Sequence, residues 1–295
     1  MQVILSTPST PLAHGLSVWS LAPSLLALAA YALAALPGAG AWARRALPLA
    51  WGLHGVAGLA HLFGIGLVMQ GARFGFAPAL SATAWMVLAV HAVESRFVPL
   101  PGVRRLLAAL GGGTLALALL FPGEGGLYPA SPWAPLHWML GLASYGLVAA
   151  AVLHAAWLDR AERAMRLRMK KPGLRTEVAA PVSAPVPALP LLTLEKLTYR
   201  FVWAGFVVLS LALALGVWVT PVWHWDHKAV FSLLGWAVLA GLLAGRQAFG
   251  WRGRMATRGL YAGAVLLLLA YVGSRFVLEV LLHRPLVSAM VGGGA

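Results

Sequence analysis

The sequence predicts an all-α membrane protein, a polytopic helix bundle with eight transmembrane helices. Of its 295 residues, 60% are hydrophobic and only 10% are charged, whereas soluble domains contain about 25% charged residues. Eight apolar segments each approach the roughly 20 residues that a helix needs to cross a bilayer. Backbone groups in lipid must be hydrogen-bonded within a helix or a closed barrel, so apolar runs of this length predict helices.

The expected helices follow one another through short connections, except after the fifth. The N-terminal residues lack the positively charged region of a cleaved signal peptide, so we expect the first helix to be retained. No internal repeat divides the chain, and residues 1–295 are expected to form a single membrane domain. The expected spans are residues 15–36, 47–69, 78–98, 103–121, 134–157, 197–219, 227–245 and 256–282.

Lysine and arginine concentrate in alternate connections, which sets the expected orientation. Eighteen of the 22 lie in the connections after the first, third, fifth and seventh helices, and three lie on the opposite side. Because cytoplasmic connections are enriched in these residues, both termini are expected outside. Topology therefore explains the net charge of +14, and a nucleic-acid partner is not expected.

The connection between the fifth and sixth helices, residues 158–196, has two parts. The stretch "LDRAERAMRLRMKK" is typical of a basic helical extension that lies on the inner surface near anionic lipid. The stretch "PGLRTEVAAPVSAPVPALPLL" is rich in Pro, Ala and Val and has no packing period, which indicates a flexible linker.

Two histidines are expected at outer helix ends. His137 begins the fifth helix and His283 ends the eighth. A pair of neutral imidazoles suits haem iron or another borderline metal. The alternative is that each histidine simply prefers a wet membrane edge. The chain has no cysteine, which excludes thiolate metal sites and covalent haem attachment.

The stretch "PVWHWDHKAVFS" places aromatic and charged residues at the same outer edge. Indoles can stack on a flat macrocycle, and Lys228 can bind a carboxylate. An interfacial aromatic belt is the alternative for the tryptophans, and Asp226 is equally suited to cap the seventh helix. The candidate ligand-contacting residues in and just before this stretch are Trp218, Trp223, Trp225, Asp226, His227 and Lys228.

Ionisable residues also occur within the expected eighth helix. Arg275 and Glu279 precede His283 at spacings of four residues, so all three are expected on one helical face. An arginine in a membrane span is costly and should face the bundle interior. Either Arg275 and Glu279 form a structural ion pair, or Arg275 binds a ligand carboxylate while Glu279 orients His283.

His54 and His91 lie at similar depths in the second and third expected helices. They are candidates for a second, inner haem site. The alternative is a hydrogen-bonded contact between packed helices, in which His91 pairs with His54 or with Glu94.

Three segments resemble the cytochrome c assembly superfamily of haem-handling membrane proteins (CcsA/CcmC/HemX-like), and the chain is most similar to its YpjD-like inner-membrane branch. "PLHWMLGLASYGLVAAAVLHAAWL" is similar to the family helix that begins with an external histidine, and "LAYVGSRFVLEVLLHRP" to the helix that ends in the second. "WVTPVWHWDHKAVFSLLGW" resembles the tryptophan-rich segment W-G-x-x-W-x-W-D, except that Val219 follows Trp218.

The resemblance implies a haem-binding, haem-exporting protein of the inner (cytoplasmic) membrane of a bacterium. It implies non-covalent haem b at the outer face, with His137 and His283 as metal ligands. The implied partners are haem, membrane lipid and a protein that takes part in haem delivery, and enzymatic activity is not expected. Two alternatives stay open: a HemX-like regulator of haem synthesis and a small-molecule transporter.

Overall fold

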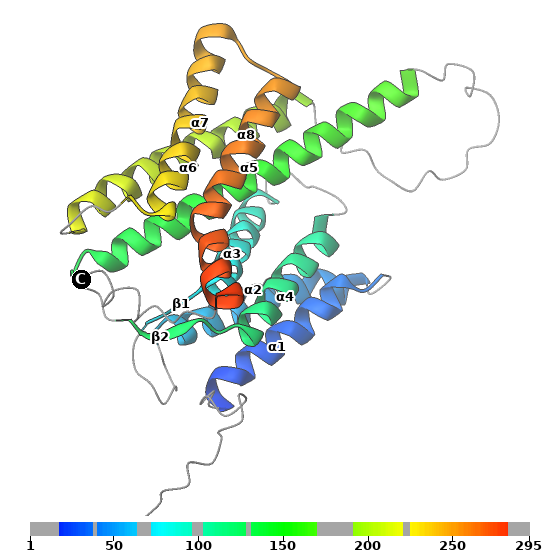
Figure 1. The fold of residues 1–295 in the computed structure, drawn as a ribbon. Helices are drawn as coiled ribbons and strands as arrows, with labels where there is room; N and C mark the ends of the chain where they lie inside the picture. Colours follow the sequence, from blue (N-terminus) through cyan, green and yellow to red (C-terminus); the bar gives the residue numbers. More distant parts are fainter. Residues whose placement is uncertain are drawn as a thin grey trace, which may run out of the picture.

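The computed structural model describes residues 18–37, 40–63, 72–95, 103–127, 131–169, 191–220 and 225–282, and the described chain is almost entirely helical (Figure 1). The helices are α1 (Val18–Ala35), α2 (Gly40–Phe63), α3 (Phe76–Glu94), α4 (Val103–Leu120), α5 (Ala134–Met169), α6 (Leu191–Val219), α7 (His227–Phe249) and α8 (Arg254–Leu268). The expected all-α architecture is confirmed.

Six helices within the described ranges are long and apolar enough to cross a membrane. They are α3, α4, α5, α6, α7 and the helical run Arg254–Leu281. The apolar part of α1 is shorter, at Leu21–Ala35, and α2 begins with Arg44 and Arg45 in its first two turns. The structure therefore shows a helical bundle with six helices of spanning length, where the sequence predicts eight spans.

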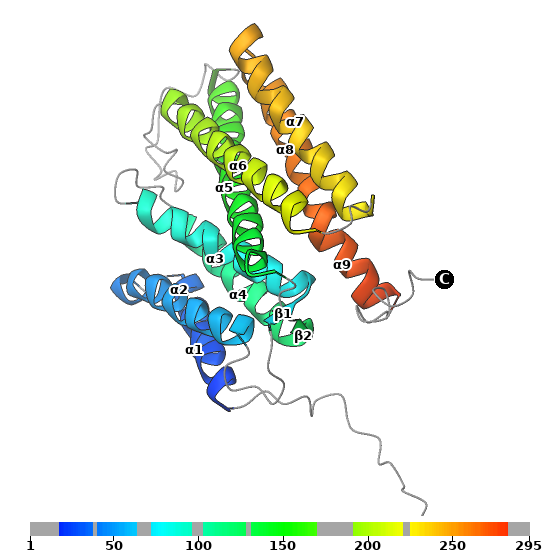
Figure 2. The same ribbon diagram turned by 90° about the vertical axis from the view of Figure 1, so that its left-hand side faces the viewer.

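The helices pack as two groups that meet along α3 and α5. The first group consists of α1, α2, α3 and α4, and its core contains Tyr31, Leu107 and their apolar neighbours. The second group consists of α5, α6, α7 and α8, and its core contains Val202, Leu239 and the apolar residues around them. Figure 2 shows the two groups side by side, with α3 and α5 at their boundary. The 36-residue helix α5 contributes to both cores because apolar residues occupy more than one of its faces.

Small residues let the helices of each group approach closely. A Cβ atom added to Gly111 of α4 would lie 2.6 Å from the Tyr31 ring of α1, so only glycine fits that contact. In the second group, Gly235 of α7 faces Leu267 of α8 in the same way. Such contacts are typical of membrane helices, where van der Waals packing rather than the hydrophobic effect holds helices together.

Two short strands, which the sequence analysis does not predict, connect the first group to the start of α5. β1 (Ala72–Phe74) and β2 (Glu124–Leu127) pair antiparallel, with Ala72 opposite Leu127. Gly75 follows β1 and Gly123 precedes β2, and the pairing brings their backbones close together. A Cβ on Gly75 would lie only 2.8 Å from the Cα of Gly123. The strands thus join the α2–α3 and α4–α5 connections at one end of the bundle.

The helical run that starts with α8 is not α-helical throughout. Two π-helical turns, Leu269–Gly273 and Val277–Leu281, flank the short α9 (Ser274–Phe276). The Leu282 amide donates to the Val277 carbonyl at 2.9 Å, five residues back. Because π-turns change the angle between successive side chains, the simple four-residue periodicity expected for Arg275 and Glu279 does not describe this segment. π-turns inside helices often occur at functional sites.

Candidate functional site

His137 lies in the first turn of α5 and is oriented by α6. Its Nδ1 atom is 2.9 Å from the carbonyl oxygen of Ala212, and its ring lies against Gly216, where a Cβ would approach Cε1 to 2.9 Å. A carbonyl can only accept, so Nδ1 must carry the donated proton. In the neutral ring, Nε2 then keeps a lone pair, which is the arrangement of a metal-ligating histidine.

Two cationic side chains lie near Tyr271 at the end of the bundle that contains His137, which we call the outer end after its expected orientation. The Lys228 ammonium lies 5.7 Å from the ring centroid of Tyr271, and the Arg275 guanidinium lies 5.8 Å from the same centroid. Lys228 also interacts electrostatically with His137 and with Arg275. The structure thus places Lys228 of α7 and Arg275 of α9 around Tyr271, which has no signal in the sequence, and Lys228 also interacts with His137 of α5.

Arg275 has unused hydrogen-bonding capacity. Its Nη1 atom is buried and has no hydrogen-bond acceptor in the part of the chain that the structure describes. A buried guanidinium N–H without a partner is costly. An anionic ligand reaching this atom would remove that cost, and a carboxylate matches the guanidinium geometry best.

Glu279 lies where the last helical turn meets α3. Its carboxylate packs against Gly75, where an added Cβ would approach Oε2 to 3.0 Å. One turn earlier, Phe276 makes an edge-on contact with Phe76 at 5.3 Å between centroids. These contacts hold the end of the run against α3 and β1, and they indicate an anchoring position for Glu279.

The tryptophan-rich stretch is only partly described. Asp226 is the N-cap of α7 and accepts a hydrogen bond from the Ala229 amide at 2.7 Å, so the expected cap is present. Trp218 and Trp225 are 82% and 72% exposed, respectively, and His227 is exposed at the start of α7. The candidates Trp223 and His283 lie outside the described residues.

The structure does not bring His54 and His91 together. His54 is buried between α1 and α3, with Nδ1 3.0 Å from the Tyr31 hydroxyl and Nε2 2.8 Å from the Ser81 hydroxyl. Both ring nitrogens are therefore occupied by protein groups. His91 is ten residues further along α3 than Ser81, and it lines a different cavity. The packed, hydrogen-bonded alternative describes His54, although its partners are Tyr31 and Ser81.

A cavity of about 330 Å³ lies beside His54, between α2, α3, α4 and α5. Its lining is mostly apolar, and His54, His61 and Ser81 supply most of the polar groups. The sequence analysis does not predict this cavity, because it depends on how four helices pack rather than on any local pattern.

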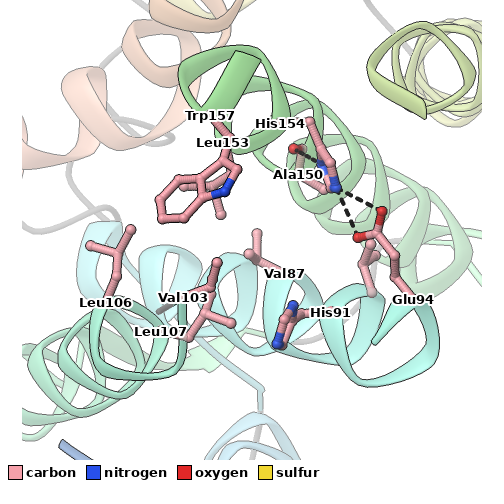
Figure 3. Close-up of a pocket in the computed structure, with 11 residues that line it drawn as sticks. Val87, His91, Glu94, Val103, Leu106, Leu107, Ala150, Leu153, His154 and Trp157 are labelled. Carbon is pink, nitrogen blue, oxygen red and sulfur yellow. Dashed lines mark hydrogen bonds and ion pairs between the residues drawn. The ribbon is translucent and has the colours of Figure 1, made fainter. Parts of the chain in front are cut away.

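A buried pair of ionisable residues joins the last residue of α3, Glu94, to His154 in the middle of α5 (Figure 3). His154 places Nδ1 2.7 Å from the Ala150 carbonyl and Nε2 2.8 Å from both oxygens of Glu94. Because Nδ1 must donate to the carbonyl, one further proton joins Nε2 to the carboxylate. His91 and Trp157 line the same small cavity. The pair leaves neither ring nitrogen of His154 available to a ligand.

Within the described ranges, no three His, Asp or Glu side chains gather as a ligand set for a bare metal ion. The outer end instead has two cations, exposed indoles and an imidazole whose Nε2 has no hydrogen-bond partner in the described part of the chain. That combination suits a planar, anionic ligand better than a simple ion.

Comparisons with known proteins show relatives and a family for this chain. Inner membrane protein YpjD of Escherichia coli K12 is 33% identical over 174 residues, covering 57% of this chain and 60% of that protein. Cytochrome c biogenesis protein CcsA of Synechococcus sp. CC9902 is 30% identical over 213 residues, covering 64% and 70%. The chain thus spans only about 60% of the length of the YpjD protein that it matches. No solved structure matches. The family model for cytochrome C assembly protein matches residues 49–282, most of the chain, and the protein therefore belongs to that family.

Proposed function

We propose that this protein binds haem b non-covalently at the outer end of the bundle and takes part in haem export or delivery. His137 and His283 are the proposed axial ligands. The observation that carries the proposal is the orientation of His137, whose Nδ1 donates to the Ala212 carbonyl and whose Nε2 has no hydrogen-bond partner among the described residues. Membership of the cytochrome c assembly family supports haem as the ligand.

The neighbouring residues fit the rest of a haem. Haem carries two propionate carboxylates, and Arg275 offers a buried N–H that no described residue satisfies. Lys228 supplies a second cation beside it. The exposed indoles of Trp218 and Trp225 are proposed to cover the apolar macrocycle, since aromatic rings stack on flat apolar surfaces. Bound haem would supply an iron centre, while these residues orient it.

The proposal includes a membrane arrangement. α1 and α2 are taken as two further crossings beside the six helices of spanning length, with both termini outside, in the inner membrane of a bacterium. Residues 158–196 then lie on the inner side. The distribution of lysine and arginine along the chain supports this orientation, and the printed name of the E. coli relative supports the inner membrane.

A haem titration in detergent tests the proposal. The purified protein is expected to bind one haem with a Soret band typical of histidine ligation, and His137→Ala should weaken binding by about tenfold or more because an axial ligand is lost. Leu136→Ala is the matched control, since this neighbour of His137 is exposed and cannot ligate iron. Absence of a Soret band after reconstitution, or equal affinity of the His137→Ala and control proteins, would overturn the proposal.

A further inference from the structure

A charged cleft of about 340 Å³ lies between the second half of α5 and the first turns of α8. Its lining includes four arginines together with Thr257 and Tyr261; the arginines are Arg163, Arg166, Arg254 and Arg258. It is far along α5 from His137 and shares no residue with the proposed haem site. Nothing in the haem proposal uses this cleft.

The positive charge of the cleft is only partly compensated. Two carboxylates line it, but Asp159 is engaged by the Tyr261 hydroxyl at 3.0 Å. Glu162 lies 3.8 Å from the exposed Arg166, a distance and exposure at which an ion pair contributes little. Among the described residues, Arg163, Arg254 and Arg258 form no ion pair.

Two arginines near the cleft, unlike Arg163, Arg254 and Arg258, do have a carboxylate partner. Arg246 forms an ion pair with Glu195 at 3.0 Å and stacks 3.3 Å from the Tyr199 ring centroid. Arg252 also lies within 3.8 Å of Glu195. Three of the four cleft arginines, Arg163, Arg254 and Arg258, have no such carboxylate among the described residues. The first turn of α8 contains no acidic residue.

We propose that the cleft binds a phosphate-bearing anion. Guanidinium groups bind phosphate oxygens through paired N–H donors, and several arginines from two helices can surround one or two phosphates. The cleft lies beside the basic connections after α5 and before α8. The expected orientation puts these connections on the inner side, where anionic phospholipid headgroups are abundant. A bound anion would bridge α5 and α8 and offset the mutual repulsion of their arginines.

Two sources supply this chemistry: a lipid headgroup and a soluble phosphate anion. The test uses the full chain in detergent and measures binding of cardiolipin and, separately, of pyrophosphate by native mass spectrometry, with zwitterionic phosphatidylcholine, which has no net charge, as the reference lipid. Arg163→Gln/Arg254→Gln/Arg258→Gln removes the cleft charge. Arg45→Gln/Arg105→Gln/Arg200→Gln removes the same charge from exposed positions on the same expected side and serves as the control.

The cleft variant is expected to lose at least about tenfold in affinity for the bound anion, while the control retains it. If the wild-type protein binds cardiolipin but not pyrophosphate, the cleft is a lipid site. If it binds pyrophosphate but not cardiolipin, the ligand is a soluble anion. Because all six positions are exposed, both variants should fold, which thermal unfolding of each protein checks. Equal losses in the two variants, or no preference for either anion over phosphatidylcholine, would overturn the proposal.

Discussion

At the scale of single residues, the hydrogen bonds of three histidines differ in how many ring nitrogens they use. His54 uses both ring nitrogens with Tyr31 and Ser81. His154 uses both with Ala150 and Glu94. Among the described residues, His137 forms a hydrogen bond through Nδ1 alone. Since a metal ligand needs a free lone pair, this comparison selects His137 and argues for structural roles for the other two.

The first prediction concerns the His154–Glu94 pair. Glu94→Gln leaves a buried His154 without its carboxylate and is expected to lower the free energy of unfolding by about 3 kcal/mol, because the remaining partner stays desolvated. Denaturant titration in mixed micelles measures this change. Glu162→Gln is the control, because this glutamate is partly exposed and should cost less than about 1 kcal/mol. Equal costs at the two positions would contradict the assignment of a buried pair.

At the scale of elements, the start of α7 illustrates how one residue serves a helix rather than a ligand. Asp226 accepts from the Ala229 amide and thereby satisfies one of the free donors of the first turn. The sequence predicts this cap because capping depends only on residues a few positions apart. The flanking Trp225 is 72% exposed.

The second prediction follows from this cap. Asp226→Ala should destabilise the protein by about 1 kcal/mol, whereas Asp226→Asn should cost much less because asparagine also caps helices. Thermal and denaturant unfolding measure both changes. Haem content distinguishes the roles: if the carboxylate contacted haem directly, Asp226→Asn would lose haem while keeping its stability.

The third prediction concerns α6, which positions His137. A Cβ on Gly216 would lie 2.9 Å from the His137 ring, so Gly216→Ala should displace the ring and weaken haem binding by about tenfold or more. Gly241→Ala is the matched control, since an added Cβ there has no neighbour within 4 Å. A haem titration of both variants measures the effect, and unchanged affinity in Gly216→Ala would argue against this role of α6.

The elements were predictable to the extent that they depend on local sequence. The expected spans at 103–121 and 256–282 agree closely with Val103–Leu120 and Arg254–Leu281 because their apolar runs are continuous. The π-turn at Val277–Leu281 and the pairing of Ala72 with Leu127 were not predictable. Both depend on how distant helices pack, which no short pattern records.

At the scale of the whole molecule, the proposed site exists only because the second helical group is assembled. His137 comes from α5, its orienting carbonyl at Ala212 from α6 and Lys228 from α7. The sequence indicated His137, Lys228 and Arg275 individually, from their positions near helix ends or within a span. The Ala212 carbonyl and Tyr271 had no sequence signal, because any residue supplies a carbonyl and a tyrosine in a helix is most often a packing residue.

The fourth prediction tests the orientation of the bundle. The chain has no cysteine, so a single introduced cysteine reports its own side of the membrane. In intact cells, a membrane-impermeant thiol reagent should label Ser131→Cys, which lies just before α5, and should not label Ser95→Cys, which follows α3. Permeabilised cells provide the control, because both positions should then react. The opposite labelling pattern would invert the bundle and place His137 at the inner face.

The measurement that tests the central claim most directly is the absorption spectrum of His137→Gly with and without added imidazole. If Nε2 of His137 ligates haem iron, the variant should lose the spectrum of a bis-histidine haem, and free imidazole should restore it by occupying the vacated position. The wild-type spectrum should not respond to imidazole. A variant whose haem spectrum matches the wild type without imidazole would contradict the account, because His137 would then not be a ligand.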